Sequence, residues 1–241
     1  MSYLLVFFAI SALILIHEAG HFAAAKWAGI PVTRFSIGFG RRLWGFKYGE
    51  TEYRVAWIPC GGYVMLDLED EQAYFALPLR KRVVFALGGP VANVLGAILC
   101  LSLIHVAQHG VSLNAVMIHP IRETWQLAVQ ICSVIPVLFT SPDQLSGIVG
   151  IVALGGEHVG MNAYRLLHFC AVINLNLAIL NLLPLPPLDG GKIVMGLMEK
   201  ISSRLERLEL PLSLAGWVAL IGLMLYLTAL DISRIVGNLV A

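Results

Sequence analysis

The chain has 241 residues, of which 58% are hydrophobic and 13% are charged. That charged share is about half the usual share in a soluble domain, so the composition is that of a membrane protein. The formal net charge of +1 provides no global basic field, which argues against a nucleic-acid-binding protein. The four cysteines form no Cys-x-x-Cys pair, and we expect free thiols.

The first apolar segment, about residues 3–26, is long enough to span a bilayer as a helix. It resembles a signal peptide, but it has no basic residues before the apolar run. Cleavage near the alanines at 23–25 would also discard the polar motif described next. We therefore predict that this segment is a retained membrane anchor.

The segment contains the motif His17-Glu18-Ala19-Gly20-His21. Two histidines four residues apart lie on one face of a helix, where one zinc ion can reach both imidazoles. A glutamate beside the first histidine is where a metalloprotease keeps its general base. Ionisable groups at membrane depth are expensive, so they usually face a partner, a cavity or a metal. The pattern predicts a zinc hydrolase whose chemistry takes place inside the membrane.

The region at about 31–68 is predicted to be rich in β-structure. Residues 51–58 alternate polar and apolar side chains, residues 59–62 are typical of a turn or bulge, and residues 63–66 are again strand-like. The stretch 32–40 has the same character and contains glycines. We expect a small hairpin or sheet on the cytoplasmic face.

Three further segments can span the membrane, at about 83–107, 165–183 and 210–230. A shorter apolar stretch, about 124–140, contains Pro136 and is expected to form an interfacial helix. At the start of the second span, Gly89 and Gly96 predict close helix packing, and Asn93 is a candidate for a supporting role behind a metal site. No repeat divides the chain, so we predict one domain over residues 1–241.

The distribution of basic residues predicts the orientation. Lysines and arginines are concentrated between the first two spans and after the third, whereas the connection 108–164 holds only Arg122. By the positive-inside rule the basic loops are cytoplasmic, and both termini then lie outside. His17 comes about 14 residues into its span, roughly 21 Å along a helix, which places the motif towards the cytoplasmic side.

Two histidines leave a catalytic zinc site one protein ligand short. Position 27, where another histidine could follow, is Trp, and Glu50 and Glu52 lie in the predicted hairpin far from membrane depth. Asp189 is the better candidate, because it follows Pro184, Pro186 and Pro187 at the inner end of the third span. From the spacing alone, Asp189 is equally well explained as an interfacial turn residue.

Several motifs, in the same order along most of the chain, resemble those of the site-2 protease family of intramembrane zinc metalloproteases. The resemblance is to the bacterial branch of regulator-of-sigma-E type proteases. The matching segments include His17–His21, the stretches 34–40, 58–64, 89–93 and 145–147, and Asn181 with Leu188-Asp189-Gly190.

The resemblance implies a mainly α-helical integral membrane protein with about four transmembrane helices. It implies that His17, His21 and Asp189 bind one zinc ion and that Glu18 is the general base. Asn181 matches a position that binds substrate or stabilises the oxyanion, and Asn176 matches a polar position near the site. The segment Gly61-Gly62-Tyr63-Val64 matches a membrane-re-entrant hairpin that holds substrate as an added strand.

Such relatives usually carry PDZ domains between the second and third spans, but here that interval has room for none. The expected substrates are single-span membrane proteins, such as an anti-sigma factor or signal-peptide remnants, in the bacterial inner membrane, with an upstream site-1-type protease as a further partner. Other readings are a membrane zinc hydrolase for another substrate, such as a prenylated peptide, and a zinc-binding scaffold or transporter. The repeated halves typical of transporters are not visible in the sequence.

Overall fold

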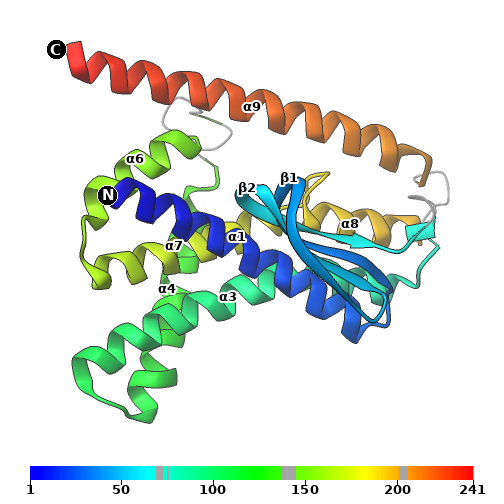
Figure 1. Cartoon of the computed structure of the whole chain (residues 1–241), viewed down its shortest axis with the longest axis horizontal. Helices are drawn as coiled ribbons and strands as arrows, with labels where there is room; N and C mark the ends of the chain where they lie inside the picture. Colours follow the sequence, from blue (N-terminus) through cyan, green and yellow to red (C-terminus); the bar gives the residue numbers. More distant parts are fainter. Residues whose placement is uncertain (69–72, 75, 137–139, 141–144, 201–205, 241) are drawn as a thin grey trace.

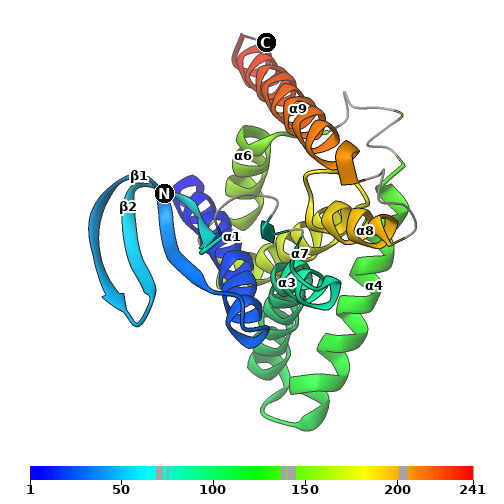
Figure 2. The same cartoon turned by 90° about the vertical axis from the view of Figure 1, so that its right-hand side faces the viewer.

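Helices of very different length form most of the molecule, and one small sheet lies on one side of them, against α1 (Figures 1 and 2). The computed structural model describes residues 1–68, 73–74, 76–136, 140, 145–200 and 206–240. In chain order the elements are α1 (Ser2–Trp27), β1 (Val32–Tyr48), β2 (Thr51–Leu66), α3 (Leu79–His109), η1 (Asn114–Ile118), α4 (His119–Val134), α6 (Ile148–Val159), α7 (Ala163–Asn181), α8 (Asp189–Glu199) and α9 (Glu206–Val240).

Four helices are long and apolar enough to cross a bilayer, namely α1, α3, α7 and residues Pro211–Gly237 of α9. Each coincides with one of the four spans predicted from the sequence, and the bounds differ by a few residues. The prediction of a mainly α-helical integral membrane protein is therefore confirmed.

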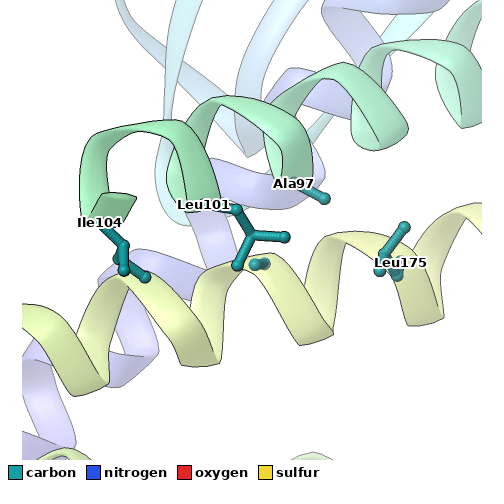
Figure 3. Packing of buried hydrophobic residues seen from close by; sticks show 5 residues of the cluster. Ala97, Leu101, Ile104 and Leu175 are labelled. Carbon is teal, nitrogen blue, oxygen red and sulfur yellow. The ribbon is translucent and has the colours of Figure 1, made fainter. Parts of the chain in front are cut away.

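The centre of the molecule is formed by α1, α3 and α7. Residues from α3 and α7 interlock in a fully buried apolar cluster (Figure 3). The cluster consists of Ala97, Leu101, Ile104, Ala171 and Leu175. On the other side of α3, the backbones of Gly20 and Gly88 approach so closely that a Cβ at either position would collide with the other helix. Small residues allow such close helix packing, which is how helices associate in lipid.

The predicted β-structure is confirmed as a small sheet built from two long, bent strands. β1 and β2 form an antiparallel hairpin that is closed between Tyr48 and Thr51. Both strands bend at glycines with positive φ, namely Gly38, Gly40 and Gly61. The bend lets the first half of β1 pair on both sides: residues 34–37 face residues 52–55 on one side and residues 62–65 on the other. Residues 59–62, predicted to form a turn or a bulge, are a bent part of β2.

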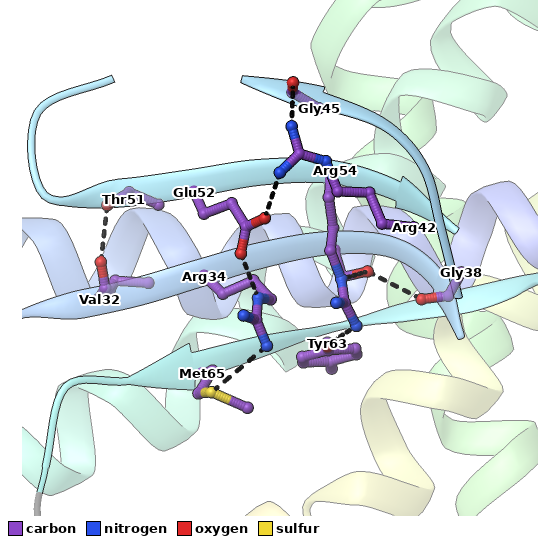
Figure 4. A network of polar contacts seen from close by, with 11 residues as sticks. Val32, Arg34, Gly38, Arg42, Gly45, Thr51, Glu52, Arg54, Tyr63 and Met65 are labelled. Atoms are coloured by element: carbon purple, nitrogen blue, oxygen red, sulfur yellow. Dashed lines mark hydrogen bonds and ion pairs between the residues drawn. The ribbon is translucent and has the colours of Figure 1, made fainter. Parts of the chain in front are cut away.

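Polar side chains tie the layers of this sheet together (Figure 4). Glu52 accepts hydrogen bonds from Arg34 at 2.6 Å and from Arg42 at 2.9 Å. Arg54 donates to the hydroxyl groups of Ser36 and Tyr63. Because its carboxylate is engaged by two guanidinium groups in the sheet, Glu52 is not available as a metal ligand.

The interval between α3 and α7 differs from the predicted interfacial helix at 124–140. The observed helix α4 begins at His119, with Pro120 at its first turn, and it ends at Val134, two residues before Pro136. Residues 137–139 of the predicted helix lie outside the described residues. The described residues of 110–162 contain helices and no strand. Two short helices, α6 and α8, were not expected from the sequence.

Candidate metal centre and active-site cavity

The two histidines of the motif lie on α1, one turn apart, and both are buried. Their Nε2 atoms are 3.1 Å from each other. α1 brings them face to face with α3, where the main-chain carbonyl of Phe85 lies 2.8 Å from Nδ1 of His21. A hydrogen bond from Nδ1–H to that carbonyl fixes the tautomer and leaves Nε2 free to bind a metal.

Asp189 completes the group. Its Oδ2 atom lies 3.3 Å from Nε2 of His17 and 3.1 Å from Nε2 of His21. Among the described residues this is the one set of three histidine, cysteine or acidic side chains whose ligand atoms converge. A tetrahedral zinc ion with bonds of about 2.0 Å holds its ligand atoms about 3.3 Å apart. Two imidazoles, one carboxylate and this spacing therefore fit zinc.

Local backbone geometry places Asp189 in the centre. The chain leaves α7 after Asn181, passes the prolines, and starts α8 at Asp189 itself. At Gly190 and Gly191 an added Cβ would collide with the carbonyl groups of residues 182–185. The glycine pair therefore lets the first turn of α8 fold back against this loop, which points Asp189 towards α1.

Two other residues shape the ligand group. Lys192 lies one turn after Asp189, and its Nζ is 3.2 Å from Oδ1, the carboxylate oxygen that faces away from the histidines. Gly89 on α3 faces the imidazoles, and a Cβ there would lie 2.6 Å from Nε2 of His17. Lys192 thus orients the carboxylate, and Gly89 leaves room for the rings and an ion between them.

A cavity of about 620 Å³ opens beside the ligands. Glu18 and Asn181 both line it, and so do Tyr63 and Val64 from the end of β2. The remaining lining residues are His17, His21, Leu66, Tyr74, Phe85, Pro186, Pro187, Leu188, Asp189, Lys192, Met195, Ser213, Trp217 and Leu220. The cavity is therefore shared by α1, β2, α3, α7, α8 and α9.

The two glycines of the predicted hairpin segment serve a different purpose from its other residues. A Cβ at Gly61 would lie 2.9 Å from the side chain of Ile14, and one at Gly62 would lie 3.4 Å from that of Leu15. Both contacts are with α1, one turn before His17. Gly61 thus lets the sheet approach the middle of the first span, and Gly62, where an added Cβ would lie 2.5 Å from the Ser36 carbonyl, lets β2 approach β1. Tyr63 and Val64 face the cavity.

The structure places the two other predicted polar residues away from the cavity. Asn176 is half-buried on α7, and its side chain donates to the Val172 carbonyl at 3.1 Å. Asn93 is fully buried on α3, and its amide has no hydrogen-bond partner among the described residues. The sequence analysis missed Asn174, which is equally buried and whose side chain contacts Gly96. A buried amide in an apolar helix is the signal that could have drawn attention to it.

Sequence analysis also missed Lys192 and the wall that α9 contributes through Ser213, Trp217 and Leu220. Lys192 follows the Asp189-Gly-Gly segment directly, so its position one turn after a ligand was a usable signal. The α9 residues carried no such signal, because an apolar span shows nothing in its sequence about which face covers a cavity.

Known proteins support this assignment of the centre. Residues 5–228 match peptidase family M50. A protein of Campylobacter jejuni named "Putative zinc metalloprotease" is 28% identical over 350 aligned positions, which cover 99% of this chain and 95% of that protein. The regulator of sigma E protease of Haemophilus influenzae is 46% identical over 101 residues, 37% of this chain and 23% of that protein. The first alignment is longer than this chain, so that relative has residues that this chain lacks.

A membrane-embedded fold with a buried His-His-Asp group defines the class as membrane metallopeptidases. The match over most of the chain shows that the protein belongs to peptidase family M50, the zinc metalloproteases of the site-2 type.

Proposed function

We propose that this enzyme is an intramembrane endopeptidase that cleaves the transmembrane segments of single-span membrane proteins, with one zinc ion per chain. The proposal rests mainly on the position of the metal-binding group. His17 and His21 lie within the first membrane-spanning helix, and Asp189 meets them from α8. A peptide bond that reaches this group must therefore come from within or close to the bilayer.

We assign Glu18 as the general base. It lies beside His17, lines the cavity and is partly exposed to it. When bound, zinc supplies the Lewis acidity that polarises a peptide carbonyl and makes water easier to deprotonate. Glu18 takes the proton from the attacking water and returns it to the leaving amine.

Asn181 is suited to stabilise the charge that develops on the carbonyl oxygen. Its amide nitrogen donates one hydrogen to the Leu177 carbonyl at 2.8 Å, which fixes the side chain. An amide nitrogen carries two hydrogens, so one is left for the cavity. Removing a single donor of this kind typically lowers the rate about 10²- to 10³-fold. Asn176 and Asn93 are proposed only as supporting residues, because neither lines the cavity.

The substrate is held as an added strand in this proposal. Within the described residues, the segment Gly62–Leu66 pairs with β1 on one side, and Tyr63, Val64 and Leu66 line the cavity on the other. A segment unwound from a helix exposes the backbone groups that a strand edge can bind. The basic loops favour a cytoplasmic position for this sheet, in the inner membrane of a bacterium and with both termini outside. The names of the regulator of sigma E proteases favour a substrate such as an anti-sigma factor, released by an upstream protease.

The first experiment measures cleavage of a tagged single-span reporter by the purified protein, together with its zinc content. Glu18→Gln should retain zinc and lose cleavage, whereas His17→Ala and Asp189→Ala should lose both. Cleavage that persists in Glu18→Gln would contradict the assignment of Glu18 as the general base. A wild type that binds zinc but cuts no unrelated reporter would favour the scaffold reading, and a wild type without zinc would refute the proposal.

The strand hypothesis needs a separate test with a matched control. Val64→Pro removes a backbone donor from the strand segment that borders the cavity, whereas Trp57→Pro makes the same change in an exposed part of β2 away from the cavity. We expect Val64→Pro to reduce cleavage at least about tenfold with zinc retained, and Trp57→Pro to have a much smaller effect. Equal effects of both substitutions would contradict substrate binding at this edge.

A further inference from the structure

A buried carboxylate in the last membrane-spanning helix has no part in the proposed chemistry. Asp231 lies on α9 and is only 2% exposed. Its Oδ2 accepts a hydrogen bond of 2.7 Å from the main-chain N–H of Gly150, in the first turn of α6. An acidic side chain within a membrane span is costly, and the amide end of a helix is a favourable partner for it. This contact therefore explains how α9 tolerates a carboxylate.

α6 is shaped to receive that carboxylate. A Cβ at Gly150 would lie 2.5 Å from Oδ1 of Asp231, and a Cβ at Gly147 would lie 3.1 Å from Cβ of Leu227 on α9. At Gly150 only a residue without a side chain allows α9 to come this close, whereas a Cβ at Gly147 needs a shift of only a few tenths of an ångström. Gly147 belongs to the segment Leu145-Ser146-Gly147, which the catalytic proposal leaves without a role.

Arg234 also contributes to the contact between α9 and the start of α6. It lies one turn after Asp231, with Nη1 3.7 Å from Oδ1, and it donates to the Leu145 carbonyl at 2.9 Å. Asp231 and Arg234 thus bind backbone groups at the start of α6 from neighbouring turns of α9. We call these two residues with Leu145, Gly147 and Gly150 the α9 latch.

The rest of α9 is sparsely packed against the protein. Only 6% of its membrane-spanning window is buried, compared with 33% for α3. α9 runs across the top of the molecule in Figure 1, with α6 beneath one half and α8 beneath the other. In the other half, Gly216 lies close to the Pro186 carbonyl, and Ser213, Trp217 and Leu220 line the active-site cavity.

We infer that Asp231 is a positioning residue, which docks α9 on the first turn of α6 and so keeps Ser213, Trp217 and Leu220 in place as a wall of the cavity. The inference rests on the proposed function. Asp231 is 14 residues from Trp217, or about 21 Å along a straight helix, so it acts through the helix and touches no reacting atom. Lipid provides no hydrophobic force to press α9 onto its neighbours, and the polar latch supplies the specific contact instead.

The test compares substitutions at Asp231 with a control on the same helix. Asp231→Ala removes the acceptor, whereas Asp231→Asn keeps an oxygen that can accept from the Gly150 N–H. Thr228→Val removes a hydroxyl group three residues earlier, which donates to the Met224 carbonyl of its own helix at 2.7 Å. For Asp231→Ala we expect KM for the reporter to rise about tenfold with kcat nearly unchanged. The KM of Asp231→Asn should lie within about threefold of that of the wild type, and the KM of Thr228→Val should equal that of the wild type.

An engineered disulfide between α6 and α9 tests whether Asp231 acts by positioning α9 or in some other way. Gly147→Cys with Leu227→Cys, in a background without the four native cysteines, places two thiols at the contact where the Cβ positions nearly touch. The disulfide should form rapidly when Asp231 is present and at least about tenfold more slowly in Asp231→Ala. Once formed, it should restore the KM of Asp231→Ala, and a reductant should abolish this rescue.

The two readouts distinguish the two proposals. Disulfide formation reports the docking of α9 without any cleavage, so a protein that cuts nothing can still support the latch. Unchanged KM and unchanged disulfide formation in Asp231→Ala would overturn the inference. A raised KM that the disulfide fails to restore would also overturn it, because Asp231 would then act in some way other than docking α9.

Discussion

The centre formed by α1, α3 and α7 and the single helix α9 meet the same cavity but are held in different ways. In the centre, glycines bring the backbones of α1 and α3 into contact, and buried apolar residues of α3 and α7 pack against one another (Figure 3). In the membrane-spanning part of α9 few residues are buried, and polar contacts of Asp231 and Arg234 attach it to the start of α6. Two of the three metal ligands come from the centre, and the third, Asp189, comes from the first turn of α8, where glycines pack closely against the preceding loop. The comparison shows that the reacting groups are fixed by packing, whereas one wall of the cavity depends on a small number of contacts.

The largest difference between the two regions is expected when a glycine in each is replaced by alanine and the zinc affinity and cleavage are compared. Gly89→Ala places a methyl group against both imidazoles, so we expect zinc affinity to fall about 10- to 100-fold, with cleavage reduced at least as much. Gly222→Ala on α9 meets nothing within 4 Å and should leave both unchanged. Competition with a zinc indicator measures the affinity. Similar losses in the two variants would show that the centre is no more tightly built than α9.

A smaller effect is expected from removing leucine side chains. Leu101 is fully buried in the α3–α7 cluster, and Leu101→Ala should lower the free energy of unfolding by about 2–4 kcal/mol. Leu225 on α9 is 67% exposed, and Leu225→Ala should change it by less than about 0.5 kcal/mol. Unfolding titrations in mixed detergent micelles measure both. A loss in Leu225→Ala as large as that in Leu101→Ala would contradict the sparse packing of α9.

The smallest expected effect is on thermal stability and concerns the sheet. Like α9, the sheet is held by polar contacts. Hydrogen bonds from Arg34 lower the pKa of Glu52 below its usual value. A lowered pKa means that the folded protein favours the carboxylate, so this stabilisation is complete above about pH 4.3 and is lost as the pH falls through the lowered value.

Accordingly, Glu52→Gln should have a slightly lower Tm than wild type at pH 7, and the difference should shrink once the pH is well below about 4. Thermal melts at a series of pH values measure it. A difference that stays constant with pH would show that the carboxylate charge contributes nothing to the sheet.

The sequence was most informative where a single element carries the chemistry. His17, Glu18 and His21 share one helix, so their spacing alone predicted two ligands on one face with a candidate base beside the first of them. Asp189 is 168 positions further along the chain than His21, and only long-range packing brings it to the histidines. Spacing left its role open, and the family resemblance supplied the expectation that the geometry then matched.

The short helices illustrate what the sequence could not reveal. α6 and α8 each contain several glycines, and glycine disfavours helices, so neither has a strong local signal. Both are stabilised by tertiary contacts: α6 by the latch with Asp231, and α8 by the ion pair of Glu199 with the buried Arg82 on α3. The spans were predictable because their length and apolarity are properties of contiguous residues.

The contact of Gly61 and Gly62 with α1 has a consequence for where a substrate is cut. The sheet rests on Ile14 and Leu15, and the first metal ligand follows on the same helix at His17. Three residues of helix rise about 4.5 Å, so α1 rigidly links the sheet that we propose holds the substrate strand to the group that we propose cleaves it. If the bilayer becomes thicker or thinner, the two places move together. Under the proposed function, the distance between the held residues and the cleaved bond is therefore set by the enzyme, and the thickness of the bilayer affects only which part of the substrate reaches the site.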